Sequence, residues 1–160
     1  MDKRALLQRV LSEIEAEIQT LTAAAKATHE AATHEESRPE NDKDTRALEA
    51  SYLARGQAKR VEEMQETHTR LRFLELRDYG DDDAIGAGAL VVVEDEEEME
   101  HTYFLVPAGG GRSLEHEGLT ITVLATGSPL GRALIGARAE DEVIVHIGKR
   151  KRSLVVISVE

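Results

Sequence analysis

Residues 7–32 read LQRVLSEIEAEIQTLTAAAKATHEAA, and this stretch decides how the first half of the chain folds. Mostly apolar residues recur at alternating intervals of four and three residues. The positions with this spacing are Leu7, Leu11, Ile14, Ile18, Leu21, Ala25, Thr28 and Ala32, of which only Thr28 is not apolar. A narrow apolar stripe of this kind is typical of a coiled coil. We therefore expect one helix from about Asp2 to Glu35, which would extend roughly 50 Å at 1.5 Å per residue.

A second stripe lies on a return helix. Its positions are Ala47, Ser51, Ala54, Ala58, Val61, Met64, His68 and Leu71. In both stripes the side chains are small near the intervening turn and larger at the far ends of the helices, as an antiparallel pairing requires. We therefore predict that residues 1–79 form a coiled-coil hairpin with an acidic tip near residues 35–44. The structural alternative is a coiled coil between two chains, but the small residues near the tip favour a hairpin within one chain and a monomer.

The tip itself contains stop and start signals for the two helices. Pro39 disfavours helical angles at Arg38, so the first helix should end by about Ser37. Ser37 and Glu40 have the spacing of a capping box, which would start the return helix.

The composition of the 160 residues excludes several kinds of function. There is no cysteine for a thiolate zinc site, and aromatic residues make up only 3%, so an aromatic-lined cofactor pocket is not expected. The net charge of -11 argues against wrapping nucleic acid as the main activity. The chain has neither a signal-peptide pattern nor an apolar run of roughly eighteen residues, so we expect a cytoplasmic protein with no membrane span.

The second half of the chain has strand periodicity and begins after a break at residues 79–83. Residues 1–79 carry 13 basic and 16 acidic residues, whereas residues 80–160 carry 7 and 15, which indicates two modules. We expect a compact α+β domain of five strands and one short helical turn within residues 128–136. The expected strands are Ala89–Glu94, His101–Pro107, Leu119–Ala125, Glu142–Ile147 and Ser153–Val159, with an acidic hairpin end at 94–100 and a basic turn at 148–152.

The segment SPLGRALIG at residues 128–136 carries a family resemblance. Together with the acids at 140–142 and the strand at 143–145, it resembles the C-terminal signature of bacterial Gre transcript-cleavage factors. The chain length, the N-terminal helical hairpin and the Asp-rich linker agree with that family. The resemblance implies an α+β protein with an N-terminal antiparallel α-helical coiled-coil hairpin (1–79) followed by a small FKBP-like β-sheet domain (80–160).

The resemblance also implies a function. The chain would be a transcription elongation factor that binds RNA polymerase in its secondary channel and stimulates cleavage of backtracked nascent RNA, so that stalled elongation resumes. It would not be an enzyme itself, because the endonuclease activity belongs to the polymerase. The residues implied to dock on the polymerase are Ser128, Pro129, Leu130, Gly131 and Arg132. Within this segment, Pro129 and Leu130 are expected to be exposed apolar contacts and Arg132 a charged one.

Acidic tip residues would act at the polymerase active site. Glu36 and Glu40 would help to hold its second Mg²⁺ and orient the attacking water, with Asp42 and Asp44 as substitutes. Two-metal hydrolysis needs both ions held against the scissile phosphate, and Mg²⁺ prefers oxygen ligands. The chain would carry no cofactor of its own.

Two cations on the return helix would contact the 3′ end of the nascent RNA. These are Arg55 and Lys59, and the alternative interpretation is a solvated helix face that pairs with Glu62 and Glu63.

The tip departs from the family pattern Asp-x-x-Glu-Asn. Glu40 and Asn41 match its second half, but the Asp position falls on Ser37, and Glu36 is the nearest acid. The alternative function is therefore a Gre-like secondary-channel regulator that binds the polymerase without stimulating cleavage and inhibits or modulates transcription.

Other patterns favour ordinary structural roles. His29 and His34 are five residues apart, so they diverge around a helix and do not form a zinc-protease motif. The basic run Lys149–Arg152 is expected to be solubilising. Prolyl isomerase activity needs aromatic pocket walls, and the second half offers only Tyr103 and Phe104, which point to opposite faces of a strand.

Overall fold

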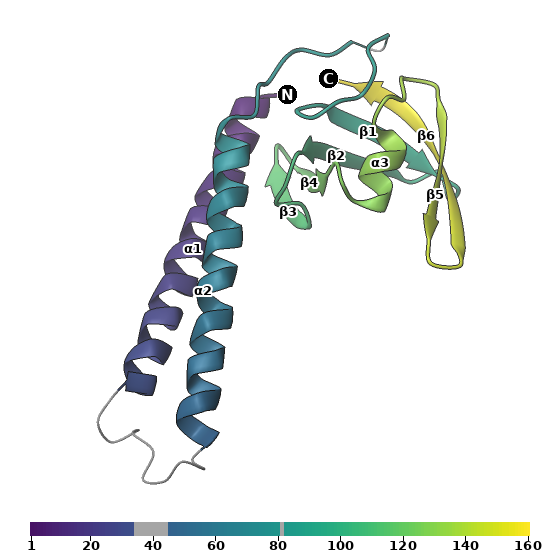
Figure 1. The fold of residues 1–160 in the computed structure, drawn as a ribbon. Helices are drawn as coiled ribbons and strands as arrows, with labels where there is room; N and C mark the ends of the chain where they lie inside the picture. Colours follow the sequence, from purple (N-terminus) through teal and green to yellow (C-terminus); the bar gives the residue numbers. More distant parts are fainter. Residues whose placement is uncertain (34–44, 81) are drawn as a thin grey trace. The chain divides into compact units, whose positions relative to one another are not determined.

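Two compact units make up the chain. The computed structural model describes residues 1–33, 45–80 and 82–160 (Figure 1). The sheet unit consists of Met1–Val10 together with Thr69–Glu160, and the hairpin unit consists of Leu11–His68. Each of the two long helices therefore belongs to the hairpin unit over most of its length and to the sheet unit at one end.

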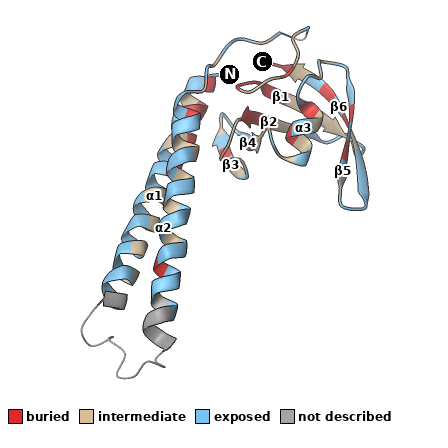
Figure 2. Cartoon of the chain, viewed as in Figure 1, coloured by how far each residue is buried: buried red, intermediate tan, exposed pale blue. Residues whose placement is uncertain are grey.

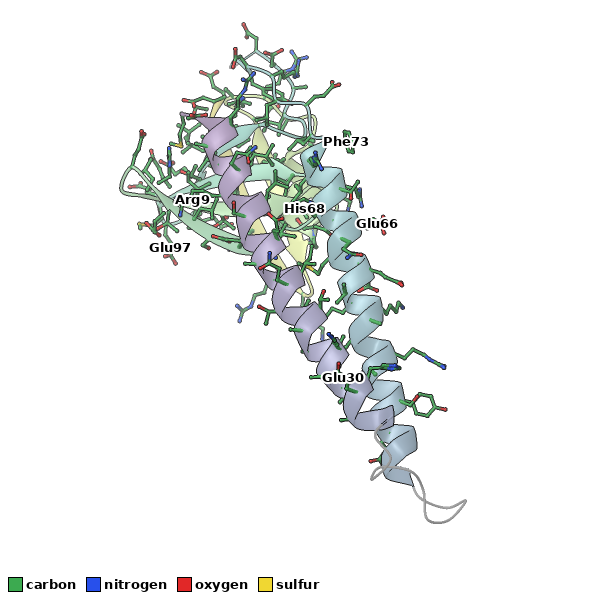
Figure 3. All side chains as sticks on the ribbon, turned by 90° about the vertical axis from the view of Figure 1, so that its left-hand side faces the viewer. Arg9, Glu30, Glu66, His68, Phe73 and Glu97 are labelled. Carbon is green, nitrogen blue, oxygen red and sulfur yellow. The ribbon has the colours of Figure 1, made fainter. Side chains whose placement is uncertain are left out.

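The hairpin unit is an antiparallel pair of helices, α1 (Lys3–Thr33) and α2 (Thr45–Arg72) (Figure 1). Along α1, the stripe positions from Leu11 to Thr28 are buried or half-buried, and Ile14 is completely buried. Arg60 on α2 forms an ion pair of 3.8 Å with Glu17 on α1. On α2, half-buried His68 lies on the seam side and exposed Glu66 on the outer side (Figure 3). The predicted hairpin is confirmed.

The stripe on α2 is less regular than the one on α1. Ala54 is buried and Val61 and Met64 are half-buried, but Ser51 and Ala58 are exposed. The small side chains leave a hollow of about 330 Å³ between the helices. It is lined by Ala25, His29, Ser51, Ala54, Arg55 and Ala58.

Helix α2 ends at Arg72, so the prediction that it continues to Tyr79 was wrong. Leu74 and Leu76 are half-buried, whereas Glu75 and Arg77 are exposed. This alternation has the period of an extended chain, because successive side chains point to opposite sides.

The sheet unit contains a mixed six-stranded sheet in the order β3-β4-β2-β1-β6-β5. Its strands are β1 (Leu90–Asp95), β2 (Glu100–Val106), β3 (Arg112–His116), β4 (Leu119–Ala125), β5 (Glu142–Ile147) and β6 (Arg150–Val159). Neighbouring strands are antiparallel except β2 and β4, which are parallel. The short helix α3 (Pro129–Leu134) lies between β4 and β5 in the sequence. The predicted α+β fold is confirmed.

The structure corrects two details of the predicted sheet. Strand β3 was not predicted, because it is an edge strand in which only Leu114 is buried and its sequence shows no apolar alternation. Residues 148–152 were predicted to form a turn. Only Gly148 and Lys149 form the turn, and the next three basic residues belong to β6.

The main core lies on the face of the sheet that α3 covers (Figure 2). Leu134 of α3 is completely buried there, and half-buried Leu130 and Ala133 pack against the same cluster. The other buried members are Ile85, Ala89, Val91, Val93, Leu105, Val143, Val145, Leu154, Val156 and Val159. Because neighbouring strand residues alternate between faces, the fully buried Phe104 belongs to the opposite face from Leu105.

Candidate functional site

Helix α3 begins with a complete cap. The hydroxyl oxygen of Ser128 accepts a hydrogen bond of 3.0 Å from the backbone N–H of Gly131. Pro129 occupies the first turn, where its missing N–H costs no helical hydrogen bond. A six-residue helix is too short to be stable alone, so the cap and the core contacts fix its position.

Gly131 lets α3 approach the chain segment before it. Gly131 is buried, and a Cβ atom added there would lie 2.2 Å from the carbonyl oxygen of Ala125 and 2.9 Å from the Cα of Thr126. Because both neighbours are backbone atoms, they cannot move aside as a side chain would. The glycine is therefore required by close packing.

The five residues expected to dock on the polymerase divide into exposed and inward-facing groups. Pro129 and Arg132 are exposed, as expected of contact residues. Leu130 is half-buried against the core, so the expectation that it is an exposed apolar contact was wrong. Ser128 caps the helix and Gly131 is buried inside it, so both determine where the helix lies and not what its surface offers.

A shallow hollow adjoins the exposed side of α3. It has a volume of about 530 Å³ and is lined by Gly86, Ala87, Thr126, Arg132 and Ile135. The Tyr79 hydroxyl donates a 2.9 Å hydrogen bond to the carbonyl of Ala87, which holds the far rim. Ile135 is 41% exposed. Ile135 and the 86–87 loop were not predicted from the sequence, although the isoleucine directly after Leu134 was a usable signal.

The guanidinium of Arg132 donates to the carbonyl oxygen of Gly127 at the start of the same segment. This hydrogen bond holds the guanidinium end of the side chain beside the segment before α3, and Arg132 remains exposed at the rim of the hollow. The arrangement joins one fixed cation, an exposed proline and a shallow apolar surface. Such a combination suits a protein partner with both apolar and acidic groups.

On the hairpin unit, Arg55 and Lys59 both lie on α2 and are exposed. Lys59 forms a 3.8 Å ion pair with Glu63 on the next turn, and both side chains are mostly exposed. Arg55 lines the hollow between the two helices. The two cations share the same helix, one turn apart, as their spacing predicted.

The acidic tip lies outside the described residues. This applies to Glu36, Glu40, Asp42 and Asp44, and also to the capping-box serine Ser37. Within the described ranges, no cluster of three or more His, Asp or Glu side chains could hold a metal ion. None of the described helices is both long enough and apolar enough to cross a membrane.

The acidic hairpin between β1 and β2 is organised by Asp95. Its carboxylate accepts backbone hydrogen bonds from Glu97 at 2.9 Å and Met99 at 3.1 Å, and it lies 2.7 Å from Nε2 of His101. The hydrogen bond to His101 is the main reason that the pKa of Asp95 is lower than usual, and the Met99 N–H adds to it. Arg152 of β6 approaches the same carboxylate at 3.5 Å. This carboxylate is a structural group of the turn.

Comparisons with known proteins identify the family. Residues 80–160 match the family model "Transcription elongation factor, GreA/GreB, C-term". A search of curated proteins finds no match. Because the family model covers half of the chain, the chain belongs to the GreA/GreB family of transcription factors.

Solved structures provide weaker matches. The Thermus aquaticus Gfh1 structure has 22% identity, covers 96% of this chain and 92% of its own, and gives a TM-score of 0.41. The Gfh1 structure of Thermus thermophilus, described as a GreA factor homolog, has 22% identity with coverages of 96% and 94% and a TM-score of 0.40. The GreA/GreB elongation factor of Nitrosomonas europaea has 18% identity, covers 64% of this chain and 90% of its own, and gives a TM-score of 0.35. With the sheet domain as the matched region and the helical hairpin before it, this protein is a Gre-family transcription factor.

Proposed function

We propose that this Gre-family factor binds RNA polymerase through the exposed side of α3, with its hairpin in the secondary channel. The observation that carries the docking proposal is the position of Pro129 and Arg132 on a capped helix beside an apolar hollow. A rigid exposed helix needs little ordering when it binds, so more of its contact free energy remains as affinity. The polymerase, which works in the cytoplasm, is the partner that the family implies.

We further propose that the tip stimulates cleavage of backtracked RNA. Glu36 and Glu40, with Asp42 and Asp44 nearby in the sequence, would supply carboxylate oxygens to the Mg²⁺ ions of the polymerase. Carboxylates are the ligands that Mg²⁺ prefers, so the donor set fits this ion. A bound Mg²⁺ would polarise the phosphate and activate the attacking water. The factor itself would only add and orient oxygen ligands, and the nuclease remains the polymerase.

The cations on α2 would meet the RNA in the same complex. Arg55 and Lys59 are exposed, and the ion pair of Lys59 with Glu63 is weak enough to exchange for a phosphate contact. Their expected partner is the 3′ segment of the nascent RNA.

The test is transcript cleavage in backtracked elongation complexes, with and without this protein. We expect the unaltered chain to accelerate release of short 3′ fragments. Glu36→Ala combined with Glu40→Ala should abolish that acceleration while polymerase binding persists. Unchanged cleavage by the double variant would reject the assignment of these two acids.

One sequence feature favours the alternative of a regulator that does not stimulate cleavage. The family position for the tip aspartate holds Ser37, which has no carboxylate. If the unaltered chain binds backtracked complexes but leaves their RNA intact, the alternative holds. Replacing Ser37 with Asp should then create cleavage stimulation where it was missing.

A further inference from the structure

One aromatic side chain on the hairpin is largely exposed. Tyr52 on α2 is 64% exposed, in a chain that has only three tyrosines, two phenylalanines and no tryptophan. The ring is therefore mainly in contact with solvent. Aromatic rings are the side chains on which nucleic-acid bases stack.

Tyr52 lies on the same face of α2 as two cations. The spacing of Tyr52, Arg55, Gly56 and Lys59 is i, i+3, i+4 and i+7, which places all four on one side of a helix. We call these four residues the Tyr52 stripe. Its two cations are exposed, and no ion pair to Arg55 is found among the residues that the structure describes. The stripe therefore combines a flat apolar ring with two positive charges.

Gly56 supplies a bare surface next to the ring. A Cβ atom added at Gly56 would meet nothing within 4 Å, so packing within the chain does not require a glycine there. Glycine destabilises an exposed helix interior relative to alanine. At i+4 from Tyr52, the missing side chain leaves the helix backbone open to a planar group that rests on the ring.

The hollow between the helices adjoins the stripe through Arg55. Arg55 belongs to the stripe and also lines the hollow, whose rim carries the polar side chains of Ser51 and His29. A strand that runs from Tyr52 toward the C-terminal end of α2 thus meets Arg55 and then Lys59, and the polar recess lies beside Arg55.

We propose that the Tyr52 stripe is a stacking site for single-stranded RNA. One base stacks on Tyr52 over the bare backbone at Gly56, and Arg55 and Lys59 pair with the phosphates beside it. Lys59 exchanges its exposed ion pair with Glu63 for a phosphate. The occupant is the extruded 3′ segment of the nascent RNA, and in naming it the inference rests on the proposed function. The stripe then contacts a base of the RNA as well as its phosphates, whereas charged side chains alone contact only the phosphates.

The test uses RNA polymerase stalled on a synthetic scaffold whose RNA carries 4-thiouridine in an unpaired 3′ segment. Irradiation links the thiobase to a neighbouring side chain, and the yield of RNA joined to this protein is measured. The amount of protein bound to the polymerase is measured in the same samples. The variants are Tyr52→Ala, Tyr52→Phe and Gly56→Leu, and the control is Leu53→Ala, which changes another exposed side chain (58%) on the next helix position.

The stacking site predicts a distinct pattern. Tyr52→Ala should lower the crosslinking yield at least about fivefold, while Tyr52→Phe, which keeps the ring, stays within about twofold of the unaltered chain. Gly56→Leu should also lower the yield, although leucine favours the helix and should raise the melting temperature of the hairpin. Leu53→Ala should leave the yield unchanged.

Each other outcome has a definite meaning. Yields that are unchanged in both Tyr52→Ala and Gly56→Leu overturn the stacking site. So does an unaltered protein that binds the polymerase without any RNA crosslink, in which case the docking proposal stands. A protein that does not bind the polymerase at all overturns the docking proposal and the stacking site together.

Discussion

At the scale of single residues, Gly131 shows how one hydrogen atom can decide the position of a helix. The Cβ of an alanine would lie 2.2 Å from the Ala125 carbonyl oxygen, far inside contact distance. Gly131→Ala should therefore force α3 away from the core and destabilise the sheet unit by about 2 kcal/mol or more. Urea unfolding followed by circular dichroism measures this loss.

Gly127→Ala is the matched control for this prediction. Gly127 lies in the same segment, but a Cβ there would meet nothing within 4 Å. Its effect should stay within about 0.5 kcal/mol, as for an ordinary surface change. Equal losses in the two variants would show that the close approach at Gly131 is not what limits substitution.

The charge on Asp95 predicts a pH dependence of stability. The pKa of Asp95 is lower in the folded state than its usual value of 3.8, chiefly because of the hydrogen bond to His101. A lowered acid pKa contributes stability that is fully present above the unfolded pKa and is lost as the pH falls through the folded pKa. Asp95→Asn keeps Oδ1 for the two backbone hydrogen bonds, removes the charge, and replaces the oxygen that faces His101 and Arg152 with an NH2 group. The variant should be less stable than the unaltered chain at pH 7, and the difference should disappear well below pH 4.

Urea unfolding at a series of pH values measures this difference. Glu97→Gln is the control, because it removes one charge from the same exposed turn without touching His101. Glu97→Gln should have the same free energy of unfolding as the unaltered chain at pH 7. A stability difference for Asp95→Asn that persists unchanged into strong acid would contradict the charge-based explanation.

Residue-level prediction from the sequence was uneven for a physical reason. The sequence placed Gly131 among the residues implied to dock, but the backbone contact that requires a glycine joins Gly131 to Ala125, and no local pattern reveals that distance. The inward position of Leu130 could have been predicted from the sequence. Leu130 and Leu134 are four residues apart and so share a helix face, and Leu134 is completely buried.

At the scale of elements, helix α3 makes the docking proposal testable without disturbing the fold. Arg132 is exposed at the rim of the hollow, so Arg132→Glu should weaken polymerase binding about tenfold by placing like charges together. Pro129→Asp should act in the same direction. Equilibrium binding to labelled polymerase, with an unfolding curve for each variant, separates lost contacts from lost structure.

Arg138→Glu is the matched control for α3. Arg138 is also exposed and follows the signature segment, so the substitution makes the same charge change outside the helix. It should leave affinity within about twofold, because Arg138 lies outside α3 and does not line the hollow. If Arg138→Glu weakens binding as much as Arg132→Glu, the effect comes from total charge and not from α3.

The predictability of each element followed its apolar pattern. The 4-3 stripe predicted α1, and the alternation in Leu119–Ala125 and Glu142–Ile147 gave the bounds that β4 and β5 have. Strand β3 buries one residue and so leaves almost no pattern. The end of α2 was missed because Leu74 and Leu76 continue the apolar composition of the helix while changing its period from 3.6 to two.

At the scale of the whole molecule, the start of the chain belongs with its end. The sheet unit includes Met1–Val10, and Leu6, Val10 and Leu71 in this unit are completely buried. The terminal ammonium of Met1 pairs with the Glu160 carboxylate at 2.9 Å. Helical periodicity shows that Leu6 and Val10 are candidates for burial, but it cannot show which distant segment shares their unit. The division between residues 79 and 80 therefore stays a prediction that chain fragments must test.

Two shortened chains provide that test. The first contains residues 80–160 alone, and the second keeps Met1–Val10 and residues 69–160 with a short Gly-Ser linker in place of the hairpin unit. The first lacks Leu6, Val10 and Leu71, and burial of three such side chains contributes on the order of 5 kcal/mol. We expect the 80–160 chain to unfold at a clearly lower urea concentration than the second chain, whose midpoint should lie close to that of the sheet unit in the full protein. Equal midpoints for the two shortened chains would instead place an independent folding boundary at residue 80, and the N-terminal segment would then add no stability to the sheet.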